Sequence, residues 1–179
     1  DAESMKLLKE VDFEVMPLAM MMNSTEKTEP YFRKADLVTF NCDAMESFAE
    51  AFSLHPQVNG LNKREVCAYM KEIGLSENLK SVGIFNYNGY EPGLLNEQLL
   101  SQMIWYLLDG VNIQRTHPKE REFETFVVMM DAEMLVFKRD VFSDLWYFGD
   151  GEKEKSIPCT REDFDMAKKG FLNKRFLKL

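Results

Sequence analysis

The sequence predicts an α/β domain with a mainly parallel sheet flanked by helices, followed by an antiparallel β-hairpin. Up to residue 110, segments of helical periodicity alternate with short apolar runs rich in β-branched and aromatic residues. After residue 110 the alternation stops, and two apolar runs follow each other closely. The 179 residues suffice for one core of ordinary size. We therefore expect a single domain over 1–179, with the parallel part in 1–110 and the hairpin and a terminal helix in 111–179.

Helices are predicted where apolar residues recur at helical spacing behind a capping residue. Asn62 and Glu65 have the spacing of a capping box, and the residues from Thr160 to Asp163 are expected to cap the last helix. Pro30 fits only the first turn of its helix. Gly74 is expected to cap the end of one helix, and Gly110 to close the next. The predicted helices are 1–10, 29–34, 44–53, 62–74, 94–109 and 160–169.

Strands are predicted where β-branched and aromatic residues cluster between polar stretches. The last two runs are separated only by Asp131 and Ala132, which indicates a tight hairpin turn. The predicted strands are 13–19, 36–42, 79–87, 122–130 and 133–139.

Composition and charge exclude several classes of function. The formal net charge of −8 disfavours binding to nucleic acid or to an anionic membrane surface. No apolar run reaches the roughly 20 residues that a membrane-spanning helix needs. The three cysteines have no CxxC spacing, which argues against a disulfide framework or a thiolate zinc site. We therefore expect a cytoplasmic protein with no nucleic-acid or membrane partner.

Three stretches of the chain carry a family resemblance. Residues 37–44 (LVTFNCDA) resemble the ureohydrolase signature, in which a strand reading Ser-Phe-Asp-x-Asp ends in two metal-binding aspartates. Residues 81–88 (SVGIFNYN) resemble the later strand, where a Glu-x-Asn sequence closes the substrate site. Residues 102–110, with 143–146 and 158–164, resemble the C-terminal region of the formimidoylglutamase-like branch of the arginase family in Bacteroidetes-type bacteria. The resemblance implies an arginase-like fold with three layers, of which this chain would be the C-terminal half. It also implies a bacterial origin.

The same resemblance implies a degenerate metal site. Members of the family hydrolyse a guanidine or amidine carbon with a hydroxide held between two Mn²⁺ ions. Asn41 stands where the family has its bridging aspartate, Asp43 at the second aspartate, and Asn86 at the glutamate. The upstream Gly-Gly-Asp-His and Asp-Ala-His-x-Asp stretches are absent from this sequence. We therefore expect that the chain alone holds no cofactor. If a missing half is present, we expect manganese, and Asp43 is the one residual metal ligand that this chain would contribute.

Three functions remain open at this point. The first is a ureohydrolase-like domain without catalysis of its own that serves structure or assembly. The second is the C-terminal half of a manganese-dependent amidine or guanidine hydrolase, formimidoylglutamase-like or arginase-like. The third is a module that binds a small polar ligand at Asn41 and Asn86, which should meet at the carboxyl edge of the sheet. The expected partner is a second copy of the chain or a missing N-terminal half.

Other candidate residues have simpler interpretations. Cys42 lies in a predicted buried strand, where an inert thiol is the usual case. His55 and His117 each precede a proline, so both are interpreted as loop residues. Asp43 could also cap the helix that we predict after its strand. The methionines at 20–22 and the apolar residues of 103–107 suit either an ordinary core or an oligomeric interface.

Overall fold

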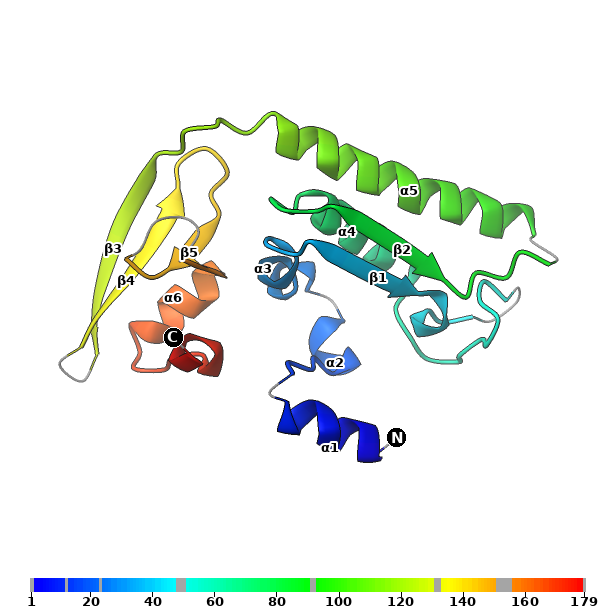
Figure 1. Cartoon of the computed structure of the whole chain (residues 1–179), viewed down its shortest axis with the longest axis horizontal. Helices are drawn as coiled ribbons and strands as arrows, with labels where there is room; N and C mark the ends of the chain where they lie inside the picture. The colour runs from blue at the N-terminus through cyan, green and yellow to red at the C-terminus, as the bar shows by residue number, and fades with distance from the viewer. Residues whose placement is uncertain are drawn as a thin grey trace.

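The computed structural model describes residues 2–11, 13–22, 24–47, 51–90, 93–130, 133–150 and 156–178. Figure 1 shows two units side by side, a parallel α/β unit and an antiparallel sheet with its own helix. The chain is thus an α/β fold, as predicted, but the described strands are not mainly parallel. The parallel sheet has two strands among the described residues, whereas the antiparallel sheet has four.

The parallel unit is built from two strands and two long helices. Strand β1 (Leu37–Asn41) pairs in parallel with β2 (Ser81–Phe85). Helix α4 (Lys63–Gly74) connects them, and α5 (Leu94–Arg115) follows β2. A parallel pair needs such a crossover, because its strands cannot be joined by a tight turn. Apolar residues of both strands and both helices form one buried cluster, which confirms these four elements.

Helix α4 begins and ends for different reasons. The predicted capping box is confirmed: the Asn62 side chain accepts hydrogen bonds from the amides of Arg64 and Glu65, and the Glu65 carboxylate accepts one from the Asn62 amide. The prediction that Gly74 is a C-terminal cap is wrong, because it is the last residue of the helix and contacts Gly110. Gly110 does not close α5 either, since that helix continues for another five residues to Arg115.

The N-terminal segment contains short helices in place of a predicted strand. They are α1 (Ala2–Glu10), α2 (Leu18–Met21), η1 (Thr25–Lys27) and α3 (Glu29–Phe32). The strand prediction for 13–19 is wrong, because Phe13 and Val15 are exposed and no described strand lies beside them. Without a partner, an apolar run gains nothing from extended pairing.

The helix predicted over 44–53 is also wrong where the structure describes it. A 3₁₀ turn, η2 (Cys42–Ala44), follows β1, and Met45 and Glu46 then form bridges to Leu61 and Gln57. The backbone of this segment pairs with a distant loop, which local helical propensity does not reveal. Residues 48–50 of the predicted helix lie outside the described part.

The C-terminal unit contains the predicted hairpin and two strands that we did not predict. The hairpin consists of β3 (Phe123–Met130) and β4 (Glu133–Asp140), and its turn at Asp131 and Ala132 lies outside the described residues. The sheet continues antiparallel through β5 (Trp146–Phe148) and β6 (Ile157–Cys159), each too short to show periodicity. Helix α6 (Arg161–Ala167) starts at the predicted Thr160 cap, and η3 (Lys174–Lys178) follows.

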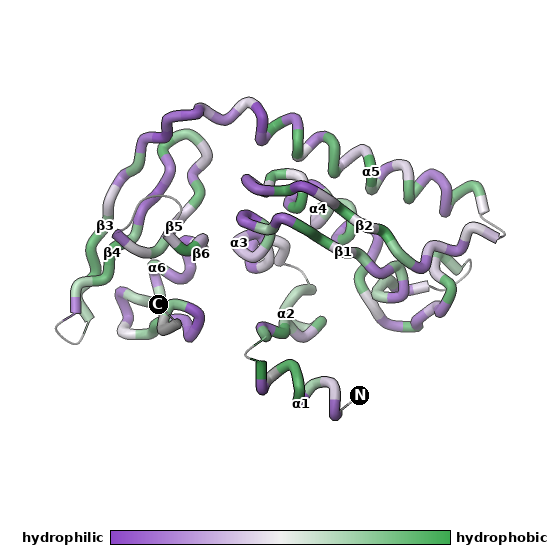
Figure 2. Tube along the Cα trace, viewed as in Figure 1, coloured by the Kyte–Doolittle hydropathy of each residue, from purple (hydrophilic) through white to green (hydrophobic). Residues whose placement is uncertain are grey.

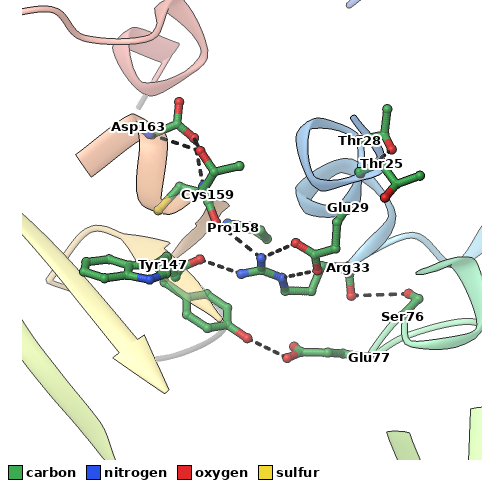
Figure 3. Close-up of polar contacts among 12 residues, drawn as sticks. Thr25, Thr28, Glu29, Arg33, Ser76, Glu77, Tyr147, Pro158, Cys159 and Asp163 are labelled. Atoms are coloured by element: carbon green, nitrogen blue, oxygen red, sulfur yellow. Dashed lines mark hydrogen bonds and ion pairs between the residues drawn. The ribbon is translucent and has the colours of Figure 1, made fainter. Parts of the chain in front are cut away.

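A buried polar junction joins the two units. Arg33, at the end of α3, pairs with Glu29 and donates hydrogen bonds to the carbonyls of Trp146 and Cys159 in the antiparallel sheet (Figure 3). The Tyr147 hydroxyl donates to Glu77, which follows α4, at 2.8 Å. The two units have separate apolar clusters, so these polar contacts link one core to the other.

The distribution of apolar and polar residues along the chain agrees with the division into two units. Figure 2 shows apolar segments along β1, β2 and the β3–β4 hairpin, with polar residues between the two units. Among the described residues, no helix combines the length and the apolar character needed to cross a membrane. The three cysteines are free and buried.

Candidate functional site

The carboxyl ends of β1 and β2 bring the predicted site residues together. Asn41 ends β1, and Asn86 follows β2 directly. The parallel register pairs Asn41 with Phe85, so both asparagines lie at the same edge of the sheet. This is the edge at which ligands bind in open α/β folds. The predicted proximity of Asn41 and Asn86 is therefore confirmed.

Asp43 lies between the two asparagines. The side chain of Asn41 accepts a hydrogen bond from the Asp43 amide at 2.9 Å, which fixes the turn after β1. The Asn86 amide nitrogen Nδ2 donates to Asp43 Oδ2 at 2.7 Å and to Asn41 Oδ1 at 3.2 Å. Asn86 has a φ of 59°, in the left-handed region that asparagine tolerates better than most residues. The backbone thus turns Asn86 toward the other two side chains.

His55 is a fourth member of this site that sequence reasoning missed. Its amide donates to Asp43 Oδ1 at 3.1 Å, and its ring nitrogen Nδ1 lies 3.2 Å from Asp43 Oδ2. Loop 51–59 holds it there, because Leu54 donates to the carbonyl of Asn86 at 2.9 Å. The ring remains 71% exposed. Nothing in the sequence indicated the pairing, since it depends on a loop folding back onto the sheet edge.

The site has one carboxylate, and its protonation is controlled by its neighbours. Partial desolvation works to raise the pKa of Asp43. The hydrogen bonds from Asn86 and His55, together with the imidazole charge, outweigh it and hold the pKa below its ordinary value. The prediction that Asp43 caps a following helix does not hold, because a 3₁₀ turn begins before it at Cys42. Its carboxylate instead binds the loop of His55.

Cys42 is adjacent to the site but takes no part in it. The side chain is fully buried, and this burial, aided by the negative charge of Asp43, raises the pKa of the thiol to about 11. A thiol with this pKa is almost entirely protonated at neutral pH and is a poor nucleophile. The interpretation of Cys42 as an inert buried thiol is consistent with this environment. His117 lies elsewhere, beside Arg121.

These residues do not fit a dinuclear manganese centre. Mn²⁺ prefers several carboxylate oxygens supplemented by imidazole, and two such ions need carboxylates to balance their charge. The site offers one carboxylate, both of whose oxygens already accept hydrogen bonds, and one exposed imidazole. Across the described ranges, no group of three or more His, Cys, Asp or Glu is arranged to hold a metal ion. The amide oxygen of Asn41 is neutral and already accepts two hydrogen bonds.

Comparison with known proteins gives a likeness of fold. No family model matches the sequence, and no curated protein matches it significantly. Among solved structures, the chain is similar to the arginase of Helicobacter pylori, with a TM-score of 0.52 and 14% sequence identity. The superposition covers 62% of this chain and 40% of the arginase chain, so this chain matches less than half of that enzyme. The greater part of the chain therefore has an arginase-like α/β fold.

Proposed function

We propose that this chain is a ureohydrolase-like domain that lacks catalysis on its own and serves a structural or assembly role. The observation that carries the proposal is the composition of the sheet-edge site. A single carboxylate, Asp43, is there hydrogen-bonded to Asn86 and His55, and a neutral amide, Asn41, lies beside it. Such a site supplies too little negative charge to bind two divalent cations and activate a water molecule between them.

A manganese titration tests this proposal. Free Mn²⁺ gives an electron paramagnetic resonance signal that disappears on binding, so the signal counts bound ions directly. We expect the wild-type chain to bind no stoichiometric Mn²⁺. Asn41→Asp restores a second carboxylate beside Asp43 and His55, and should tighten Mn²⁺ binding at least about tenfold. Asn112→Asp adds the same charge at an exposed position near the C-terminal end of α5 and should have no effect. Two ions bound per wild-type chain would overturn the proposal.

The second candidate is the C-terminal half of a manganese-dependent amidine or guanidine hydrolase. The pairing of His55 with Asp43 favours it, because an imidazole and a carboxylate are two of the ligand types that such a centre uses. The match to 40% of an arginase is compatible with a missing half that supplies the remaining ligands. In that case the single polypeptide made by its own cell should have a mass of about twice 20.9 kDa. It should also release urea or formamide from a guanidine or amidine substrate.

The third candidate is a site for a small polar ligand at Asn41 and Asn86. It would be abandoned if the double change to alanine left the binding of every candidate ligand intact.

Two further proposals concern the fold and the cellular location. We propose that β1 and β2 belong to a three-layer arrangement of formimidoylglutamase-like type completed by further strands, because a two-stranded parallel sheet is unusual alone. We also propose a cytoplasmic location, which the three free cysteines support.

A further inference from the structure

A pocket of about 310 Å³ lies between the N-terminal segment and the C-terminal end of the chain. Its walls come from residues 16–31, from residues 160–166 in and just before α6, and from residues 171–175 after that helix. Contacts between these parts hold the walls in place. Lys27 pairs with Glu162 at 3.6 Å, and the guanidinium of Arg175 lies over the Tyr31 ring, 5.0 Å from its centroid. None of the residues that line the pocket belongs to the sheet-edge site.

The apolar part of the pocket is rich in methionine and aromatic side chains. It consists of Met16, Met20, Tyr31, Met166, Phe171 and Leu172. Met20 is 56% exposed and Phe171 is 63% exposed, so this apolar surface is open to solvent and is not part of either core. Methionine sulfur makes favourable contacts with aromatic rings, and the flexible side chain adapts to their shape. The apolar part therefore suits a small aromatic ring.

The charged side chains of the pocket neutralise one another. Lys27 pairs with Glu162, and Arg175 pairs with Asp163 at 3.4 Å. The Asp163 carboxylate also accepts hydrogen bonds from the amide and the hydroxyl of Thr160, at 2.8 and 2.9 Å. The charged residues that line the pocket thus leave it with no net charge. Because a charged ligand would lose water there without gaining a free counter-ion, the pocket favours a neutral ligand.

Arg175 keeps hydrogen-bond donors that are not used within the described part of the chain. Its side chain is 9% exposed, and Nη2 donates to the carbonyl of Pro158 at 2.7 Å and to Asp163. Nε is buried and has no hydrogen-bond partner among the described residues, and Nη1 has none there either. The guanidinium also lies over the Phe176 ring, 5.0 Å from its centroid, which restricts its rotation. A buried donor without an acceptor is costly, so an oxygen atom beside this guanidinium would be stabilising.

We propose that this pocket binds a small, neutral aromatic molecule that carries a carbonyl oxygen, such as an aryl amide. The ring packs among the methionines and Phe171, and the carbonyl oxygen accepts a hydrogen bond from Arg175. The volume equals that of roughly ten water molecules, which admits one six-membered ring with a short polar arm. This binding function goes beyond the structural role proposed above and does not depend on it.

Three aromatic probes of similar shape and different charge test the proposal. Phenylacetamide is neutral and has a carbonyl oxygen, phenylacetate is an anion, and 2-phenylethylammonium is a cation without an acceptor. Methyl-labelled methionine reports the place of binding in NMR, because Met16, Met20 and Met166 line the pocket and the other nine of the 12 methionines do not. We expect phenylacetamide to shift these three methyl signals and the Nε signal of Arg175. It should bind at least about tenfold more tightly than either charged probe.

A variant that fills the pocket shows whether the probe binds inside it. Met166→Trp should abolish the shifts of the Met16 and Met20 methyl groups, because the larger side chain occupies the space of the ring. Met134→Trp is the matched control at a 62% exposed position on β4 outside the pocket, and it should preserve those shifts.

A second variant tests the hydrogen bond and keeps the inference testable if the first folds poorly. Arg175→Lys retains a positive charge beside Asp163 and removes the unpaired Nε and Nη1 donors. It should weaken the binding of phenylacetamide at least about fivefold, because the carbonyl oxygen loses its donor. Arg115→Lys makes the same change at an exposed position at the end of α5 and should leave the affinity unchanged.

Several results would overturn the inference. Binding of phenylacetate or 2-phenylethylammonium as tight as that of phenylacetamide would do so, as would no binding of phenylacetamide at its solubility limit. Shifts confined to methionines outside the pocket would do so too. If a second copy of the chain covers the pocket, the three methyl signals should shift with protein concentration in the absence of any probe, which would also overturn it. The proposed lack of catalysis is tested separately, by Mn²⁺ binding and hydrolysis.

Discussion

Arg33 joins parts of the chain that lie more than a hundred residues apart in sequence. Its side chain is 1% exposed, pairs with Glu29 and donates to the carbonyls of Trp146 and Cys159. The guanidinium also lies over the Tyr147 ring, 4.7 Å from its centroid. A buried cation with this many partners leaves several polar groups unsatisfied when it is removed.

We expect Arg33→Ala to lower the free energy of unfolding by about 3 kcal/mol, because the Glu29 charge and two carbonyls lose their partner. Urea unfolding at pH 7 measures the change. Arg139→Ala is the control, since that arginine pairs with two carboxylates, Glu124 and Asp144, but is 34% exposed. Its loss should be far smaller. Equal losses in the two variants would contradict the assignment of Arg33 as the junction between the units.

The acidity of Asp43 can be tested at the same scale. Asn86→Ala removes the strongest neighbour that favours the charged carboxylate, so the pKa of Asp43 should rise toward about 3.9, the ordinary value for aspartate. The carboxyl carbon resonance in NMR follows this titration. Asn112→Ala, at an exposed position near the C-terminal end of α5, should leave the pKa unchanged. An unshifted pKa in Asn86→Ala would show that the 2.7 Å contact does not govern Asp43.

The lowered pKa of Asp43 also determines how the stability of the fold changes with pH. The folded-state pKa of Asp43 lies below its unfolded value, so its contribution to stability is present above about pH 4 and is lost as the pH falls through the folded pKa. Asn86→Ala should therefore be less stable than wild type at pH 7, and the difference should shrink below pH 4. A difference that grows on acidification would contradict this assignment.

The sequence predicts the part of the site whose geometry follows from the direction of the strands. Asn41 and Asn86 were placed at one sheet edge because parallel strands end on the same side, and the structure confirms it. His55 was missed because its position depends on hydrogen bonds between loop 51–59 and the residue after β2. Such contacts leave no periodic signal in the sequence.

At the scale of elements, the contact between α4 and α5 depends on two glycines. A Cβ on Gly74 would lie 2.2 Å from the Leu107 carbonyl oxygen, and one on Gly110 would lie 2.3 Å from that of Lys71. Both contacts are with backbone, which has little room to shift. Glycine is therefore required by the closeness of the helices, whereas the sequence suggested only helix ends.

We expect Gly74→Ala to destabilise the fold by about 2 kcal/mol or more, because the helices must separate to admit the methyl group. Without the neighbouring helix the same change should stabilise, since alanine favours the helical state by about 1 kcal/mol over glycine. Gly89→Ala is the control, with no atom within 4 Å of its added Cβ. Thermal unfolding compares the three proteins. A Gly74→Ala variant at least as stable as wild type would contradict the close packing.

The elements that sequence predicted well carry their own start signals. The Asn62 and Thr160 capping boxes both formed, and the hairpin strands are two long apolar runs separated by only two residues. The failures have a different physical origin. Residues 13–17 have no described strand to pair with, residues 45–46 pair with a distant loop, and β5 and β6 are three residues each. Local propensity contains no information about those partners.

At the scale of the whole molecule, two apolar cores are joined by a polar junction, and the sheet-edge site lies in the parallel unit. The greater part of the chain has an arginase-like fold, and the site lies at the carboxyl ends of the two parallel strands. Fold alone does not carry activity, which depends on the side chains at that edge. Those side chains provide one carboxylate where a dinuclear centre needs several.

The most direct test of this account is a hydrolysis assay on the chain with saturating Mn²⁺ and a panel of linear guanidines and amidines, formimidoylglutamate included. Release of urea and formamide is measured against a buffer blank. The account predicts no release above the blank, because Asp43 is the only carboxylate at the sheet-edge site among the described residues. Turnover by the wild-type chain that Asp43→Ala abolishes would contradict it and establish the site as catalytic.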